Sequence, residues 1–198
     1  MNTKLIGYTC HSGGCAGADM NWENEGNKYG VKTVAYSFYN HVQDSANQKI
    51  LTVDELNEGF KNVMIAAQTL KLTPETQGNY TKNLLSRNWF QVKNSDIIFA
   101  ISKKFKDVDK TIVDGGTGWA VQMAVDNNKP IFVFDQPTEK WNTYDYTINK
   151  FKPIGDLIPK LTHMFAGIGT RDINENGINA IKNIYKSTIM WLDECHEI

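Results

Sequence analysis

The chain has 198 residues, of which 41% are hydrophobic and 22% charged, and it carries 21 basic against 22 acidic side chains. This length predicts one domain that can bury a substantial core without disulfides or structural zinc. The formal net charge of −1 argues against a protein held to nucleic acid mainly by phosphate contacts, because those contacts need clustered lysine and arginine. A small anionic ligand needs only one local site and is compatible with this charge.

The three cysteines indicate a reducing compartment and no metal site. They are odd in number, and Cys10 and Cys15 have only Cys195 to join them in a zinc site. The longest apolar runs, such as 97–101, are too short to cross a bilayer, and residues 1–20 lack the basic and apolar regions of a secretion signal. We therefore expect a cytoplasmic protein with no metal, cofactor or membrane contact.

The first forty residues predict a strand, a glycine turn, a helix and a second strand. Residues 4–9 have strand composition, although Gly7 weakens the pattern. A predicted helix over 20–29 ends at Gly30, which is typical of a C-terminal cap, and 31–38 is rich in β-branched and aromatic residues. This order favours a βαβ unit, whose parallel strands need a crossover helix.

The rest of the chain continues the alternation of helices and strands. Apolar residues at helical spacing predict helices over 53–70, 80–93 and 119–127, and a final helix with a core face from Ile178 to Leu192. Apolar runs typical of fully buried strands occupy 96–101, 130–134 and 164–168, while 136–151 shows no clean period. We predict an α/β protein with a Rossmann-like, doubly wound, mainly parallel sheet and helices on both faces.

Three glycine-rich segments each fall between a predicted strand and a predicted helix. They are Ser12 to Gly17, Gly115 to Gly118 and Gly167 to Arg171. Glycine lets a ligand approach the backbone closely, and the following helix points its first N–H groups and its positive dipole end at the turn. In open α/β sheets, ligands bind at such turns at the carboxyl ends of the strands. Any one turn is as easily structural as functional, but three together favour a phosphate or pyrophosphate site.

Two common phosphate-binding motifs do not occur in the sequence. No glycine is followed by the Lys-Ser/Thr pair of a Walker A loop, and no complete GxGxxG opens the first βαβ unit. The glycine segments therefore do not predict a standard P-loop or a standard dinucleotide-binding Rossmann domain.

Taken together, these segments resemble the SLOG superfamily, a Rossmann-like group that contains DprA-type and LOG-type proteins. Residues 12–19 (SGGCAGAD) are similar to the SGGAxGAD turn of DprA-like members. Arg87 precedes Asp96 by the interval found in LOG phosphoribohydrolases, and the segment at 115–118 is similar to their PGGxGTxxE element. Residues 165–171 (FAGIGTR) are similar to the AIVGSR strand and turn that normally opens a DprA-like domain.

The order of these segments differs from that of the family. In DprA-like domains the GxGTR-type element comes first, whereas here it comes last. We interpret residues 1–198 as a single, circularly permuted domain in which 164–198 supply the first strand and helix, since termini often lie close together. The alternative is that the C-terminal glycine strand resembles the family element by coincidence.

Gln122 stands where the LOG element has its glutamate, an acid that takes part in cleaving the N-glycosidic bond of a nucleoside monophosphate. An amide can hydrogen-bond a ribose hydroxyl but cannot act as a general base. Asp114 also replaces the proline of that element. The resemblance therefore implies a ligand binder more than a hydrolase, unless Glu23, Glu25 or Asp19 replaces the missing acid.

The turns and the resemblance together define the expected ligand-binding residues. They are Ser12, Gly13, Gly14, Gly17, Asp19, Arg87, Gly115, Gly116, Thr117, Gly118, Gln122, Gly169, Thr170 and Arg171. A guanidinium group can clamp a phosphate through its planar fork, and we favour this role for Arg87 over the alternative of a pair with a carboxylate on the helix surface. Asp19 can either cap its own turn or accept a hydrogen bond from a ribose hydroxyl.

Four more side chains near the turns are candidates for ligand contact: His11, Trp22, His41 and Trp119. His11 can contact a phosphate, and His41 follows a predicted strand end, where ligand-contacting side chains collect. The two tryptophans can stack on a base, but large aromatic residues are more often part of the core. Cys10 and Cys15 lack the Cys/His/Asp context of a nucleophile, so we expect no cysteine chemistry.

Three functions follow as hypotheses. The first is noncatalytic binding of a nucleotide or an NAD-derived, ADP-ribose-type signal, by sensing or by sequestration. SLOG domains of antiphage systems sense such signals, and a phage-encoded sponge in the host cytoplasm would act as an anti-defence protein. The second is a LOG-like nucleotide N-glycoside hydrolase, and the third is a DprA-like single-strand DNA binder, which the near-zero net charge disfavours. LOG-like relatives commonly dimerise, so the resemblance also implies a homodimer or higher homo-oligomer.

Overall fold

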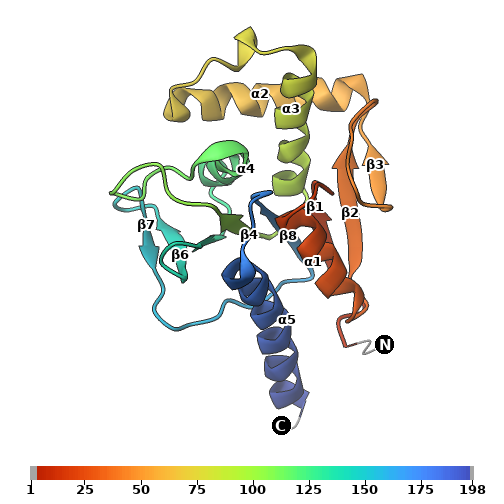
Figure 1. Ribbon diagram of the computed structural model, residues 1–198, viewed down its shortest axis with the longest axis vertical. Coiled ribbons are helices and arrows are strands. Elements are labelled where there is room, and N and C mark those ends of the chain that lie inside the picture. The colour runs from red at the N-terminus through yellow and green to blue at the C-terminus, as the bar shows by residue number, and fades with distance from the viewer. Residues whose placement is uncertain (1–3, 197–198) are drawn as a thin grey trace.

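The computed structural model describes residues 4–196, which form one eight-stranded sheet with helices on both faces (Figure 1). The strands are β1 (Thr9–Ser12), β2 (Lys32–Ser37), β3 (Gln48–Ile50), β4 (Ile97–Ser102), β5 (Ile131–Asp135), β6 (Lys140–Asp145), β7 (Lys150–Pro153) and β8 (Met164–Gly169). The α-helices are α1 (Ala18–Asn27), α2 (Val53–Leu70), α3 (Asn79–Lys93), α4 (Gly115–Asp126) and α5 (Glu175–His196). Among these residues no helix has both the length and the apolar composition that a membrane crossing needs.

The strands stand in the order β3-β2-β1-β8-β4-β5-β6-β7 across the sheet. The pairs from β3 to β5 are parallel, and β6 and β7 add an antiparallel hairpin at one edge. This confirms the predicted α/β class with a mainly parallel, Rossmann-like doubly wound sheet.

The two faces of the sheet bury separate hydrophobic cores. Alternate residues of β4 divide between them, because successive side chains of a strand point to opposite faces. Ile98 and Ala100 join the core beneath α2, α3 and α4, whereas Phe99 and Ile101 join the core beneath α1 and α5. Figure 1 shows α2, α3 and α4 above the sheet and α1 and α5 below it. The carboxyl ends of the central strands therefore open between two helical layers.

The last strand of the chain, β8, lies in the middle of the sheet between β1 and β4. If β8, β1, β2, β4 and β5 are numbered 1 to 5 in that order, their order across the sheet is 3-2-1-4-5. This order is typical of doubly wound nucleotide-binding folds. Lys4 forms an ion pair with Asp193 of α5, so the two ends of the described chain lie side by side. The circular permutation itself stays a prediction from the order of the motifs.

Several local expectations were wrong in position. The first strand begins at Thr9, because Gly7 (φ +92°) takes part in a turn in which the Tyr8 N–H donates to the Leu5 carbonyl. The helix expected over 119–127 already begins at Gly115, so the glycines are its first turn. Residues 140–153 form the β6–β7 hairpin, which the sequence did not predict, and β3 is a short exposed edge strand that was also missed.

Candidate functional site

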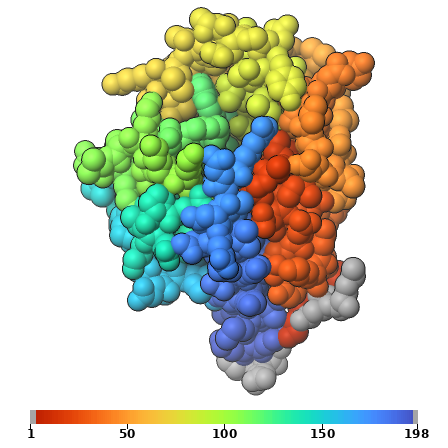
Figure 2. All heavy atoms as spheres, in the orientation of Figure 1, coloured from red at the N-terminus to blue at the C-terminus, as the bar shows by residue number. Residues whose placement is uncertain are grey.

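A cavity of about 530 Å³ lies at the carboxyl ends of β1, β4 and β8, below α3 and beside the first turn of α4. Figure 2 shows the blue segment around residue 170 lying between the red segment of the first turn and the green segment that leads into α4. The expected site residues that line the cavity are Asp19, Arg87, Gly115, Gly116, Thr117, Gly169, Thr170 and Arg171. Residues far apart in the sequence therefore meet in one hollow.

Arg87 is a buried cation with unfilled hydrogen-bonding capacity. Its side chain is only 5% exposed, and its Nε atom has no hydrogen-bond partner among the described residues. Nη2 donates toward the sulfur of Cys15 at 3.4 Å. With the amide of Gln91 oriented so that its oxygen faces these donors, that oxygen accepts from Arg87 Nη1 at 2.7 Å and from the Gly13 N–H at 2.8 Å. The carboxyl group of Asp19 lies nearby but forms no ion pair with this guanidinium group, and a buried, incompletely paired cation favours an anionic ligand.

Both arginines of the chain, Arg87 and Arg171, line this cavity. The other nineteen of the chain's 21 basic residues are lysines. None of the ion pairs within the described residues involves either arginine. Arg171 is exposed and its Nη2 lies 3.9 Å from the sulfur of Cys15. The planar guanidinium group of arginine matches the geometry of phosphate. The placement of both arginines at this cavity therefore favours a phosphate-containing ligand.

Asp19 is buried at the floor of the cavity, close to both arginines. Its Oδ2 accepts a hydrogen bond from the Cys15 N–H at 3.3 Å. Burial raises the pKa of Asp19 to about 6, although the charges of Arg87 and Arg171 and the backbone donors oppose the increase. The carboxyl group is therefore placed to accept a hydrogen bond from a ligand hydroxyl and to exchange a proton near neutral pH.

The first and third glycine turns are packed tightly against each other and against the site. A Cβ atom on Gly17, whose φ is +94°, would lie 2.5 Å from the Cα of Arg171. A Cβ on Gly13 would lie 1.9 Å from Nη1 of Arg87 and 2.6 Å from Oδ2 of Asp19. The Ala18 N–H at the start of α1 donates to the Thr170 carbonyl. The protein itself therefore accepts a hydrogen bond from one of the first N–H groups of α1, which we had expected to bind a ligand.

The N-terminus of α4 differs because its glycines face open space. No atom lies within 4 Å of the Cβ position of either Gly115 or Gly116, and both residues are exposed at the cavity. The N-cap residue Asp114 makes no side-chain hydrogen bond to the helix. The first turn of α4 thus lines the cavity without a side-chain cap, and an uncapped helix N-terminus is an arrangement that binds anions.

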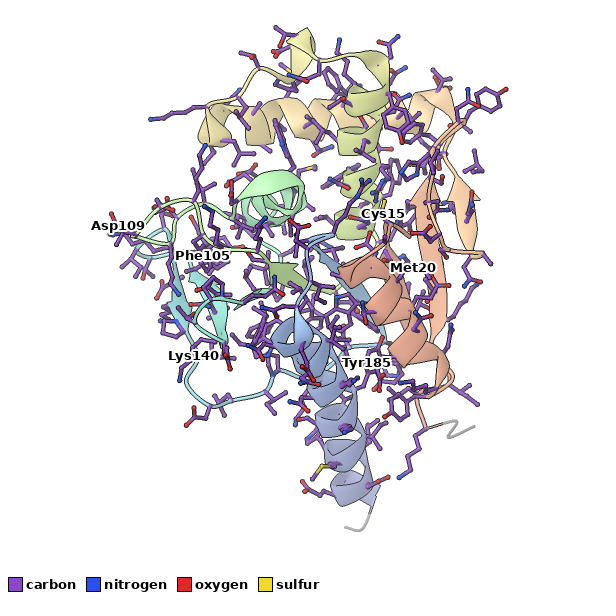
Figure 3. The ribbon with its side chains drawn as sticks, viewed as in Figure 1. Cys15, Met20, Phe105, Asp109, Lys140 and Tyr185 are labelled. Atoms are coloured by element: carbon purple, nitrogen blue, oxygen red, sulfur yellow. The ribbon has the colours of Figure 1, made fainter. Side chains whose placement is uncertain are left out.

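Cys15 and His41 form a contact that the sequence analysis ruled out. The Cys15 sulfur lies 3.8 Å from His41 Nε2, and His41 Nδ1 lies 3.1 Å from Ser37 Oγ. Cys15 lines the cavity, and Figure 3 labels it between the lower end of α3 and the start of α1. The expectation that Cys15 lacks a histidine neighbour is therefore wrong, because β2 returns the chain to the first turn only in the folded protein.

Several expected site residues do not line the cavity. Gln122 donates to Asp126 at 2.8 Å on α4, and Gly118 packs against the Val113 carbonyl, where a Cβ would lie at 2.1 Å. Ser12 is buried in β1, and Gly14 packs against the side chain of Gln43. Ligand contact by the Gln122 side chain does not fit this arrangement.

The aromatic and acidic candidates are also placed elsewhere. Trp22 is part of the core, where its ring covers Gly167 and its Nε1–H donates to the Ile168 carbonyl. Trp119 lies in the core on the other face of the sheet, so base stacking by either tryptophan does not fit. His11 contacts the Tyr36 hydroxyl at 3.0 Å inside the fold, and Glu23 accepts from Asn47.

Further cavity residues were not among the expected site residues, although Cys15 and Ile168 lie inside the glycine segments identified from the sequence. They are Cys15, Leu84, Leu85, Asn88, Gln91, Lys103, Asp114, Ala120, Ile168 and Asp172. Several of them stand one helical turn from Arg87 on α3, so the helical period was the signal that could have identified them. Lys103 and Asp172 pair with each other at the rim at 2.7 Å.

Among residues 4–195, no group of three or more histidine, cysteine and acidic side chains is arranged to hold a metal ion. No protein-family model matches the chain, and no curated protein or solved structure matches it.

Proposed function

We propose that this protein binds a nucleotide or an NAD-derived, ADP-ribose-type ligand in the cavity without cleaving it, and so senses or sequesters it. The observation that carries the proposal is that the chain's only two arginines line one cavity and form no ion pair within the described residues. Arg87 lines the cavity and forms no ion pair within the described residues, so an incoming phosphate gains a charge-assisted hydrogen bond without displacing a salt-bridged carboxylate.

The remaining walls suit the other parts of such a ligand. The open N–H groups at Gly115 and Gly116 offer a second anion site, as a diphosphate requires. Asp19 offers a carboxyl group to ribose hydroxyls, in the manner of the acidic residue of dinucleotide-binding folds. The volume of about 530 Å³ lies in the range typical of small-molecule sites. A mixed set of cationic and acidic groups favours a phosphorylated sugar over a bare anion.

The alternative function is hydrolysis of an N-glycosidic bond, and Asp19 is the observation that favours it. Its carboxyl group faces the cavity with a pKa raised by burial to about 6, a value suited to a general acid. Glu23, the other acid considered, does not line the cavity and accepts from Asn47 at 2.6 Å. Two other carboxylates line the cavity: Asp114, and Asp172, which is paired with Lys103. Neither Glu23 nor Glu25 lines it, so the acids expected to replace the LOG glutamate are not beside Asp19.

The test is recovery of ligand from the purified protein. The protein is incubated with AMP, ADP-ribose, NAD and cyclic ADP-ribose isomers, separated from free ligand and denatured, and every fraction is analysed by mass. We expect an intact ligand to be released from the wild-type protein and to be lost with Arg87→Met. Lys49→Met, which removes a cation outside the cavity, is the matched control. Free base with ribose phosphate would instead establish the hydrolase, and no bound ligand would contradict both.

A further inference from the structure

The environment of the Cys15 sulfur is unusual for a thiol that is only 7% exposed. The sulfur lies 3.4 Å from Nη2 of Arg87, 3.9 Å from Nη2 of Arg171 and 3.8 Å from Nε2 of His41. It also donates toward the Gly13 carbonyl at 3.8 Å. The nucleophilic form of cysteine is the thiolate, and neighbouring positive charge stabilises that form.

His41 is placed to act as a base toward this sulfur. Its Nδ1 lies 3.1 Å from Ser37 Oγ, and its ring stacks on Phe38 with the ring centroids 4.7 Å apart. Burial, reinforced by the charges of Arg87 and Arg171, lowers the pKa of His41 to about 4. The imidazole is therefore neutral at pH 7, and its Nε2, 3.8 Å from the Cys15 sulfur, can accept the thiol proton, although the low pKa makes it a weak base. A nucleophile, a base and a group that orients the base form the pattern of an activated cysteine.

A second, independent observation points to a ligand beside the thiol. The side chain of Arg87 is 5% exposed, its Nε lacks a partner within the described residues, and it lines the same cavity as Cys15. The cavity therefore offers an anion site next to the sulfur.

We propose that Cys15 and His41 form a nucleophile–base pair, and that Cys15 reacts covalently with small anionic electrophiles held by Arg87 and Arg171. With iodoacetate as the probe, a bond forms between the sulfur and the methylene carbon while the carbon–iodine bond breaks. Iodide leaves with the electron pair, and the thiol proton passes to His41 Nε2 and then to water. This activity goes beyond reversible ligand binding and does not depend on the ligand being a nucleotide.

The experiment compares two reagents at the three cysteines of the same molecule. Iodoacetate is anionic and iodoacetamide is neutral, and peptide mass spectrometry gives the alkylation rate of each cysteine with each reagent. Cys195 is exposed and follows Glu194, so it is the internal reference, and buried Cys10 reports unfolding. We expect the iodoacetate-to-iodoacetamide rate ratio at Cys15 to exceed that at Cys195 by about tenfold, because local positive charge concentrates anions. A ratio at Cys15 equal to or below that at Cys195 would overturn the proposal.

Two variants separate the base from the anion site. His41→Gln should slow both reagents at Cys15 and leave Cys195 unchanged. Arg171→Gln should slow iodoacetate at Cys15 more than iodoacetamide and so lower the ratio there. Alkylation of Cys10 in His41→Gln would show that this variant unfolds. In that case Ser37→Ala, which removes the hydroxyl group beside His41 Nδ1, is tested in its place. If His41→Gln or Ser37→Ala is folded and its Cys15 alkylation rates equal those of the wild type, His41 does not act as a base toward Cys15. No nucleotide is present, so the outcome is independent of whether the ligand proposed above binds.

Discussion

Two glycine-rich segments differ in how protein atoms surround them: the packed wall at the first turn (Gly13 and Gly17) and the open wall at the start of α4 (Gly115 and Gly116), of which only the open wall's glycines line the cavity. At the first turn, Gly13 and Gly17 are glycines because Arg87, Asp19 and the 170–171 backbone occupy the space that a Cβ would need. At α4, Gly115 and Gly116 have no atom within 4 Å of their Cβ positions. Gly115 (φ +73°) still has a conformational reason to be glycine, but Gly116 has none within the protein. The comparison teaches that protein atoms enclose the first turn, whereas the start of α4 leaves open space at the cavity, where we propose that the ligand binds.

The largest effect should come from adding a methyl group to the packed wall. Gly17→Ala places Cβ 2.5 Å from the Cα of Arg171 and forces a positive φ on a residue that disfavours it. We expect the free energy of unfolding to fall by more than about 3 kcal/mol. Urea denaturation followed by circular dichroism measures this. A loss below about 1 kcal/mol would mean that the two turns are not in close contact.

The buried acid of the packed wall should give a pH-dependent stability. The pKa of Asp19 is raised from 3.8 to about 6, so ionisation costs more in the folded than in the unfolded chain. Below about pH 4 the acid is protonated in both states and does not affect the free energy of unfolding. As the pH rises from about 4 to 6, the free energy of unfolding falls, and above pH 6 the total loss is roughly 3 kcal/mol. Urea unfolding of the wild type and of Asp19→Asn at several pH values isolates this effect. A stability difference between the two proteins that does not change with pH would show that Asp19 is not buried.

The arginine between the two walls should matter for binding and little for folding. Arg87→Met removes the cation that faces the anion site, and we expect ADP-ribose affinity to fall on the order of 50-fold. Arg87→Lys keeps the charge but loses the planar fork, so its loss should be intermediate. Isothermal titration measures both. The unfolding free energy of Arg87→Met should stay within about 1 kcal/mol of the wild type, because an unpaired buried charge stabilises little. Equal affinities for all three proteins would remove Arg87 from the site.

The smallest effect on stability should come from the open wall. Gly116→Ala places a methyl group in empty space on a helix, and we expect the unfolding free energy to rise by up to about 1 kcal/mol. Gly78→Ala is the control, since Gly78 is the N-cap residue of α3, has open space at its Cβ position and does not line the cavity. Gly116→Ala should weaken ADP-ribose binding while Gly78→Ala does not. If both variants bind ADP-ribose with the affinity of the wild type, the ligand does not contact the start of α4.

Much of the fold could be predicted because single elements carry strong local signals. The helix at 53–70 was predicted with the bounds of α2, since its apolar period is clear and Thr52 and Glu55 form a capping box. Strands β4 and β5 are continuous apolar runs. The β6–β7 hairpin was missed because its short strands bury few residues, namely Trp141, Asn142 and Phe151, and these do not alternate along the chain.

The site was predictable only in part. The three turns and Arg87 could be placed together because the carboxyl ends of parallel strands meet at one edge. Their sequences could not show which glycines are enclosed, since that depends on neighbours up to 154 residues away, as Gly17 and Arg171 are. The contact of Cys15 with His41 likewise depends on the register of β1 against β2. Composition and spacing carry no signal for such contacts.

The most direct test of the account follows the backbone amide resonances of the glycines by NMR during titration with ADP-ribose. If the cavity binds the ligand, the amides of Gly115 and Gly116 shift in a saturable way with one ligand bound. The amides of Gly13 and Gly17, which the protein itself encloses, should shift less. Saturable shifts at Gly13 and Gly17 without shifts at α4, or no saturable shift at any of them, would contradict the central claim that the open N-terminus of α4 is an anion site.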